Sequence, residues 1–237
     1  MKKSYRFWFT AAVITIGIAN FPHGRAAHAQ PAGAATQRKP AEIQVAGAPI
    51  ATRVLVQSPA ETVTDLQVIC LFEASQESPL KGALLETNEK LKGLLEQIRK
   101  PALFRGELGE TIVIAPPAGS LGAKKLLVIG LGDAAAFTPQ KMNLVGAIVY
   151  RESTRMGIVH PYFAPTVLDG GVTKFSTGDV AEKFVAGFLR AARTEKLLPG
   201  ADSSARPVVQ SLTFLAGPSH AADTEQGIER GFAKRDE

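Results

Sequence analysis

The chain has 237 residues, with 27 Lys or Arg, 22 Asp or Glu and one Cys, and this single cysteine excludes an internal disulfide. Residues 1–29 hold four of the basic residues and no acidic one, so the rest of the chain carries 23 basic and 22 acidic side chains. This near-neutral balance gives no sign of the basic patch or stripe that nucleic-acid binding needs, so no nucleic-acid partner is expected. The remaining length of about 208 residues is enough for one hydrophobic core.

Residues 1–29 have the pattern of a secretory signal peptide. Lys2, Lys3 and Arg6 precede an apolar run at 7–19, and Ala27-His28-Ala29 gives a small-x-small cleavage site. The run is shorter than the about 20 residues that cross a bilayer, although an uncleaved anchor is the alternative. We therefore expect cleavage after Ala29, a periplasmic or secreted protein, and no membrane span in the mature chain.

Residues 30–52 are rich in Ala, Pro, Gly and Gln and show no period, which predicts a flexible tether. Order is expected to begin near Arg53, so that residues 53–237 form one domain.

The first half of this domain contains two strand patterns and one helix pattern. Residues 54–56 form a short strand candidate, and 66–72 form a stronger one that is apolar on both faces, as in a covered sheet. Ser78-Pro79 is a good helix start, and Pro101 ends the pattern. One apolar stripe at helical spacing joins Leu80, Leu84, Leu91, Leu95 and Ile98.

Strands and helices continue to alternate along the second half. Asp179 and Glu182 have the spacing of a capping box at the start of one helix. This alternation predicts an α/β fold, a three-layer sandwich in which helices flank a mixed, mostly parallel sheet. The predicted strands are 110–115, 126–132, 158–163 and 208–215, and the predicted helices are 139–156, 179–193 and a short one from about 221.

The residue types that perform catalysis are scattered. Metal-dependent hydrolysis needs converging carboxylates, yet Asp65, Asp133, Asp169 and Asp179 occur singly. After signal removal only His160 and His220 remain, in separate segments outside any HExxH pattern. Cys70 lies in mid-strand, where a thiol is buried and poorly ionised. We therefore expect no catalytic residue and no bound metal in this chain.

One turn is a candidate for ligand binding. Gly130-Leu131-Gly132-Asp133 follows a strand and precedes a helix, and open α/β sheets bind ligands at the carboxyl ends of their strands. We name Gly130, Gly132 and Asp133 as ligand-binding candidates. Ala135 stands where a dinucleotide fingerprint has its third glycine, so a tight turn without a ligand is the alternative. Asp169-Gly170-Gly171 predicts a second reversal.

The ordered set of features resembles the N-terminal domain of the leucine (cytosol) aminopeptidases. A basic pair, an apolar strand and a Gly-Leu-Gly at Lys124–Gly132 give the closest match. Gly227–Asp236 resembles the helix that leads into the catalytic domain of that family. The resemblance implies a macrodomain-like fold for residues 53–237. The other matching segments are 66–72, 104–107, 109–111, 139–156 and 179–193.

The resemblance implies little chemistry for this chain. In the family the two metals, the catalytic lysine and arginine and the carboxylate ligands belong to the C-terminal domain, which we expect to be absent here. No cofactor is therefore expected in this chain. Manganese or zinc is expected only if a separate catalytic domain is present. Macrodomain likeness also implies binding of ADP-ribose or a related nucleotide, although the Asn-rich loop used for it is not evident.

Three interpretations remain open at this point. The first is an exported, non-catalytic module that binds a protein partner or self-associates. The second is a shortened metal-dependent leucyl aminopeptidase. The third is a small-ligand protein that uses the turn at 130–133.

Overall fold

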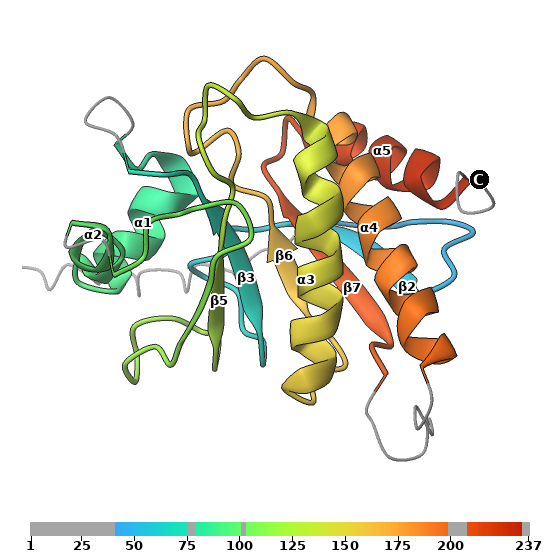
Figure 1. Cartoon of the computed structure of the whole chain (residues 1–237), viewed down its shortest axis with the longest axis horizontal. Coiled ribbons are helices and arrows are strands. Elements are labelled where there is room, and N and C mark those ends of the chain that lie inside the picture. The colour runs from blue at the N-terminus through green and yellow to red at the C-terminus, as the bar shows by residue number, and fades with distance from the viewer. Residues whose placement is uncertain (1–40, 75–78, 101–102, 199–207, 234–237) are drawn as a thin grey trace, which may run out of the picture. The chain divides into compact units, whose positions relative to one another are not determined.

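A seven-stranded mixed sheet organises the computed structural model, which describes residues 41–74, 79–100, 103–198 and 208–233. The strand order is β1-β2-β7-β6-β3-β5-β4. The neighbours from β2 to β5 are parallel, and only the outer strands β1 and β4 run antiparallel (Figure 1). The strands are β1 Glu42–Gln44, β2 Ala51–Val56, β3 Gln67–Leu71, β4 Thr111–Ile114, β5 Leu126–Gly130, β6 Tyr162–Ala164 and β7 Ser211–Ala216.

Three long helices cover one face of this sheet. They are α3 (Met142–Arg155), which follows a 3-10 turn, α4 (Thr177–Leu197) and α5 (Ala221–Ala233) (Figure 1). Their apolar residues pack with those of the strands in one large core, where the rings of Phe163 and Phe184 stack at 3.9 Å. The predicted α/β sandwich with a mixed, mostly parallel sheet is confirmed.

Two short helices cover part of the other face, where the sequence predicted one long helix. The helices are α1 (Gly82–Lys90) and α2 (Leu94–Arg99), and the single-helix prediction is wrong. Lys92 and Gly93 have positive φ angles of 56° and 81°, which an α-helix does not tolerate. The apolar stripe survives the break because both helices still bury leucines in a second core.

Glycines let the long helices approach one another closely. A Cβ on Gly146 of α3 would lie 2.0 Å from the carbonyl oxygen of Phe184 on α4. A Cβ on Gly187 would lie 1.9 Å from the carbonyl oxygen of Asn143, and one on Gly227 of α5 would lie 2.0 Å from that of Gly178. Any larger side chain at these positions would push the helices apart.

The N-terminal boundary of the ordered domain is earlier than predicted. Residues 42–44 form β1 and 51–52 begin β2, so the tether prediction for 30–52 is wrong over its last part. A three-residue edge strand with an exposed-partly buried-exposed pattern is too short to show a period in the sequence. The predicted signal peptide and residues 30–40 lie outside the described residues. Within the described ranges no helix is long and apolar enough to cross a membrane.

Candidate functional site

The predicted ligand turn after β5 is occupied by another part of the chain. The loop 104–110 crosses the end of β5 and bonds to its backbone. Gly130 N–H donates to the Glu110 carbonyl at 2.8 Å, and Gly109 N–H donates to the Gly130 carbonyl at 3.0 Å. Gly132 N–H donates to the Gly106 carbonyl at 2.8 Å. These backbone groups are therefore satisfied within the protein.

Each candidate residue of the turn has a structural reason for its identity. A Cβ on Gly130 would lie 2.0 Å from the Glu107 carbonyl oxygen, so the crossing loop requires glycine there. Gly132 has a φ of 75°, a conformation that favours glycine. The Asp133 carboxylate accepts a hydrogen bond from Ala135 N–H at 2.9 Å, which closes a local turn. Ligand binding by Gly130, Gly132 and Asp133 stays a prediction.

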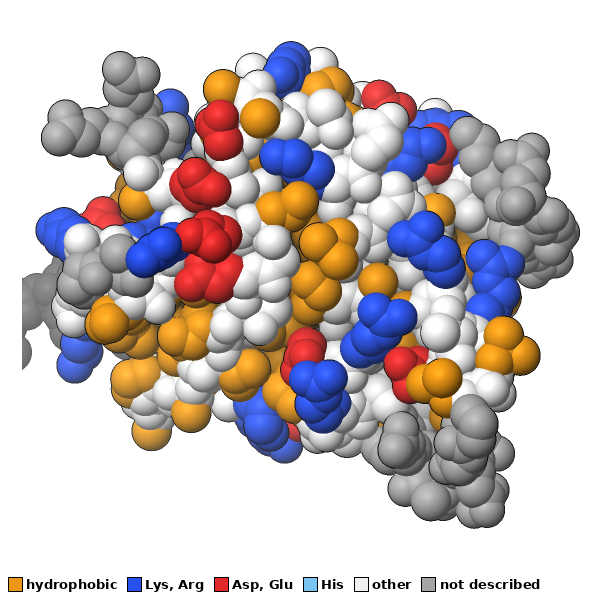
Figure 2. All heavy atoms as spheres, viewed as in Figure 1, with side chains coloured by type: hydrophobic (Ala, Val, Ile, Leu, Met, Phe, Trp, Pro, Cys, Tyr) orange, Lys and Arg blue, Asp and Glu red, His pale blue; other side chains and the backbone are white. Residues whose placement is uncertain are grey.

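Segments that carry acidic residues meet at this turn. The Oε2 atom of Glu110 accepts hydrogen bonds from the three backbone N–H groups of residues 105–107, at 2.7–3.1 Å. Glu73 N–H donates to the Gly132 carbonyl, so the segments that carry Glu73, Glu107, Glu110 and Asp133 meet here. Acidic side chains form a row on one side of the face seen in Figure 2. Carboxylates in such a position repel an anionic ligand.

The second predicted reversal also has a structural role. Its Asp169 Oδ1 accepts a hydrogen bond from Ala83 N–H at 3.2 Å and so caps α1, whose own N-cap residue, Lys81, makes no side-chain cap bond. Burial raises the pKa of the Asp169 carboxyl, while the Ala83 hydrogen bond and the nearby His220 act in the opposite direction. Of the two glycines, only Gly171 has a positive φ.

The histidines and the cysteine lie apart from one another. The His160 Nδ1 atom lies 2.8 Å from the Ser211 hydroxyl, far along the chain from His220. Cys70 is completely buried, and burial raises the pKa of its thiol well above the ordinary value. Within the described ranges, no three His, Cys, Asp or Glu residues are grouped so that they could hold a metal ion.

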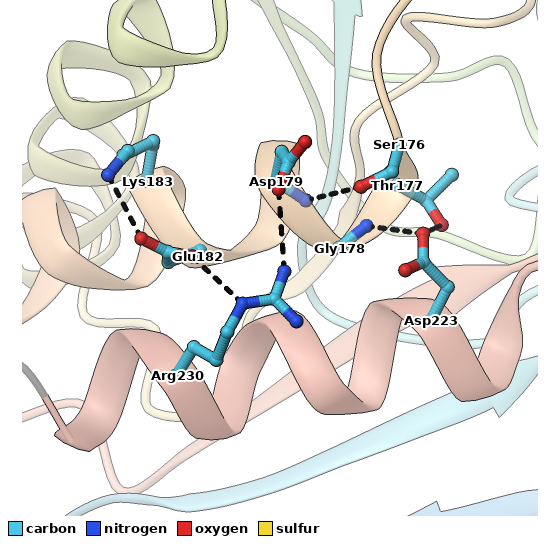
Figure 3. Close-up of polar contacts among 8 residues, drawn as sticks. All are labelled: Ser176, Thr177, Gly178, Asp179, Glu182, Lys183, Asp223 and Arg230. Atoms are coloured by element: carbon cyan, nitrogen blue, oxygen red, sulfur yellow. Dashed lines mark hydrogen bonds and ion pairs between the residues drawn. The ribbon is translucent and has the colours of Figure 1, made fainter.

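A polar network fixes the N-terminus of α4 against α5 (Figure 3). The Ser176 hydroxyl accepts a hydrogen bond from Asp179 N–H at 3.0 Å, so Ser176 is the N-cap and the predicted start at Asp179 is three residues late. Asp223 of α5 accepts bonds from the Thr177 hydroxyl at 2.8 Å and from Gly178 N–H at 2.7 Å. Because α5 supplies this second cap, the sequence around 179 alone does not reveal it.

Charged groups extend the network along both helices. Glu182 is buried, and its carboxylate binds Lys183 at 2.9 Å and Arg230 of α5 at 3.0 Å (Figure 3). The predicted capping role of Glu182 is therefore wrong, since α4 begins at Thr177, five residues before Glu182, and the carboxylate binds the side chains of Lys183 and Arg230. Burial alone would raise the pKa of the Asp223 carboxyl, but its hydrogen bonds and the charge of Arg230 hold the pKa below the ordinary value.

An open groove lies on the outer side of α3 and α4. We call it the α3–α4 groove, and its volume is about 530 Å³. Its lining includes three basic side chains, Lys141, Arg151 and Arg190, and two leucines, Leu108 and Leu144. The same face in Figure 2 shows hydrophobic side chains gathered over α3 with basic side chains around them. The groove therefore combines positive charge with exposed apolar surface.

Two of these cations have no partner among the described residues. Among the residues that the structure describes, neither the Lys141 ammonium nor the Arg190 guanidinium forms a hydrogen bond or ion pair. Arg151 contacts Glu195 at 3.5 Å and is 45% exposed. The sequence analysis did not identify this groove. Spacings of three and seven residues place Lys141, at the N-cap of α3, on the same side as Leu144 and Arg151 of that helix, but no local pattern says which helix lies beside that side.

Comparison with known proteins gives one family and one fold. Residues 68–192 match the N-terminal domain of the cytosol aminopeptidase family. A probable cytosol aminopeptidase of Roseiflexus castenholzii is 27% identical over 175 residues, which cover 74% of this chain and 32% of that protein. This chain thus corresponds to about a third of that relative's length.

Solved structures agree on the fold. A mutant of tomato leucine aminopeptidase superposes with a TM-score of 0.55 at 17% identity, covering 75% of this chain and 35% of the other. The Trypanosoma brucei macrodomain in complex with ADP-ribose superposes with a TM-score of 0.53 at 14% identity, covering 74% of this chain and 68% of the other. The predicted macrodomain-like arrangement is confirmed.

Proposed function

This chain belongs to the cytosol aminopeptidase family through the N-terminal domain of that family, and on this premise we propose that it is an exported, non-catalytic module that binds a protein partner. One contrast carries the proposal. The backbone groups at the carboxyl end of β5 are engaged in holding the loop 104–110, whereas the charged groups of Lys141 and Arg190 in the α3–α4 groove have no partner among the described residues.

The non-catalytic part of the proposal rests on how the carboxylates are used. Metal-assisted hydrolysis needs several carboxylates that converge on the ions. Here Glu110 holds the loop 104–110, Asp169 caps α1 and Asp223 caps α4. Each carboxylate is thus committed to a different part of the fold. Under the proposal, any manganese or zinc belongs to a separate catalytic domain.

The exported part of the proposal rests on the sequence of residues 1–29. A basic start, a short apolar run and Ala27-His28-Ala29 support cleavage after Ala29 and a periplasmic or secreted mature protein. The test is to express the full chain with a C-terminal tag, fractionate the cells and sequence the N-terminus of the purified protein. We expect a chain that begins at Gln30 outside the cytoplasm, and a chain that retains Met1 in the cytoplasm would refute export.

An activity assay tests the absence of catalysis. The purified chain is loaded with manganese or zinc and given leucine-p-nitroanilide, with a full-length peptidase of the family as the positive control. We expect no release of p-nitroaniline. Turnover that a chelator abolishes would refute the non-catalytic role and favour the interpretation as a shortened peptidase.

Nucleotide binding at the turn 130–133 is the competing interpretation. Its support is the fold shared with a macrodomain that was solved with ADP-ribose, while the carboxylates around the turn oppose an anionic ligand. A thermal-shift measurement with ADP-ribose tests it, because a ligand that binds only the folded state raises the unfolding temperature. We expect no shift, and a shift that Gly132→Val removes would favour the competing interpretation.

A further inference from the structure

We propose that the α3–α4 groove binds a segment of a partner protein that carries acidic and apolar side chains together. This inference rests on the proposed function and deepens it, because it assigns the binding surface and the chemistry of the partner. It is carried by the charge of the groove, by its exposed leucines and by the rigidity of its walls.

The charge of the groove calls for carboxylates. Lys141 and Arg190 are unpaired within the described part of the chain, and Arg151 has only the contact with Glu195. A guanidinium group binds a carboxylate through two parallel hydrogen bonds, and these charge-assisted bonds are stronger than neutral ones. A partner segment with well-placed Asp or Glu side chains satisfies all three cations.

The leucines of the groove call for apolar side chains beside those carboxylates. Leu108 and Leu144 are each 41% exposed, and both line the groove. The small residues Ala147 and Ala191 also line the groove, and both are buried between α3 and α4. Burial of apolar surface stabilises an interface in proportion to the area removed from water.

The walls of the groove are already in place without a partner. The backbone contact of Gly187 with Asn143 fixes the separation of α3 and α4. The loop that carries Leu108 is tied to β5 by the Gly109–Gly130 hydrogen bond. A preformed groove binds more tightly than a flexible one, because less conformational entropy is lost on association.

Charge also indicates which of the candidate molecules can occupy the α3–α4 groove. Residues 1–40 of this chain carry six basic side chains and no acidic one, so they do not complement the groove, and a second copy docked groove to groove would present the same cations. A nucleic acid presents phosphates along its backbone and no aliphatic side chain for Leu108 and Leu144, so it would match only the charge of the groove. An acidic and apolar protein segment is the occupant that fits both the charge and the leucines.

The test measures fluorescence anisotropy with a labelled peptide in which glutamate and leucine alternate. We expect the full chain to bind this peptide, with weaker binding at high salt. The double variant K141E/R190E should weaken binding at least about tenfold, a change of about 1.4 kcal/mol. The matched control K100E/K196E makes the same charge change on exposed lysines outside the groove and should leave binding unchanged. Leu144→Gln should weaken binding several-fold without altering charge.

Each other outcome overturns a defined part of the argument. Equal binding by K141E/R190E and by the control would remove the groove as the site and leave the module proposal standing. Equal affinity for a glutamate–serine peptide or for duplex DNA would show general polyanion binding and overturn the inference. No binding to the glutamate–leucine peptide would also overturn it, while turnover of leucine-p-nitroanilide would instead refute the proposed function. Circular dichroism of each variant confirms that it is folded.

Discussion

Replacement of Gly130 by alanine should strongly destabilise the fold. The added Cβ would lie 2.0 Å from the Glu107 carbonyl oxygen and 2.6 Å from the Gly106 carbonyl carbon. Real Cβ atoms do not approach backbone this closely, so the loop 104–110 has to move away from β5. That movement breaks or stretches the hydrogen bonds that Gly130 and Gly132 make with the loop.

The magnitude follows from two effects. Overpacking of a well-packed site costs about 1–3 kcal/mol, and each lost backbone hydrogen bond costs about 1 kcal/mol. Three such bonds join this loop to the end of β5, so we expect Gly130→Ala to lower the free energy of unfolding by about 3–5 kcal/mol. This is a large fraction of the about 5–15 kcal/mol by which native proteins are stable.

The assay is urea unfolding of the full chain, followed by far-ultraviolet circular dichroism. Gly217→Ala is the matched control, because a Cβ there would make only an ordinary contact of 3.7 Å with the His220 ring. We expect the control to change stability by less than about 1 kcal/mol. Equal stability of the two variants would refute the reasoning. Unchanged stability of Gly130→Ala combined with lost ligand binding would instead show that the glycine serves a ligand.

Three further predictions concern the caps and the thiol. Asp223→Ala should lower the free energy of unfolding by about 1 kcal/mol at neutral pH, because α4 loses a cap. Since the pKa of Asp223 is lowered in the fold, the difference in unfolding free energy between the variant and the unsubstituted chain should shrink as the pH falls below 3.8, as urea titrations would measure. Asp169→Asn keeps an oxygen that can accept the hydrogen bond from Ala83 N–H. Because the pKa of Asp169 is raised in the fold, we expect this variant to be at least as stable at pH 7 as the unsubstituted chain. A clearly less stable variant would contradict this expectation. Cys70 should react with a thiol reagent only in denaturant, and rapid reaction of the native protein would show that the strand opens.

Local sequence patterns were sufficient to predict most strands of the sheet and most of the helices. The apolar runs at 66–72 and 126–132 predicted β3 and β5, because a strand covered on both faces has apolar residues at every position. Helical spacing of the leucines predicted which side of α1 and α2 faces the core. Periodicity failed at Lys92 and Gly93, since it reports the buried face and not the backbone angle of a single residue.

For the candidate sites too, the sequence indicated part of each site and the tertiary structure supplied the rest. The glycines at the end of β5 predicted a ligand-binding turn or a tight turn without a ligand, and only the structure identified the group that approaches Gly130 as the loop 104–110. Likewise, the residues of the α3–α4 groove show helical spacing within each helix, but the pairing of those helices comes from glycine contacts between distant segments.

The sequence by itself therefore determined most of the strands and helices and their buried faces, but not β1 or the break between α1 and α2, because it reports only the order of apolar and polar residues along a short stretch. Only the tertiary structure decided the caps that Asp169 and Asp223 provide, the pairing of Glu182 with Arg230 and the position of the groove. The physical reason is that these contacts join residues that are far apart in the chain. The distance between such residues is set by how whole elements pack and not by any local pattern.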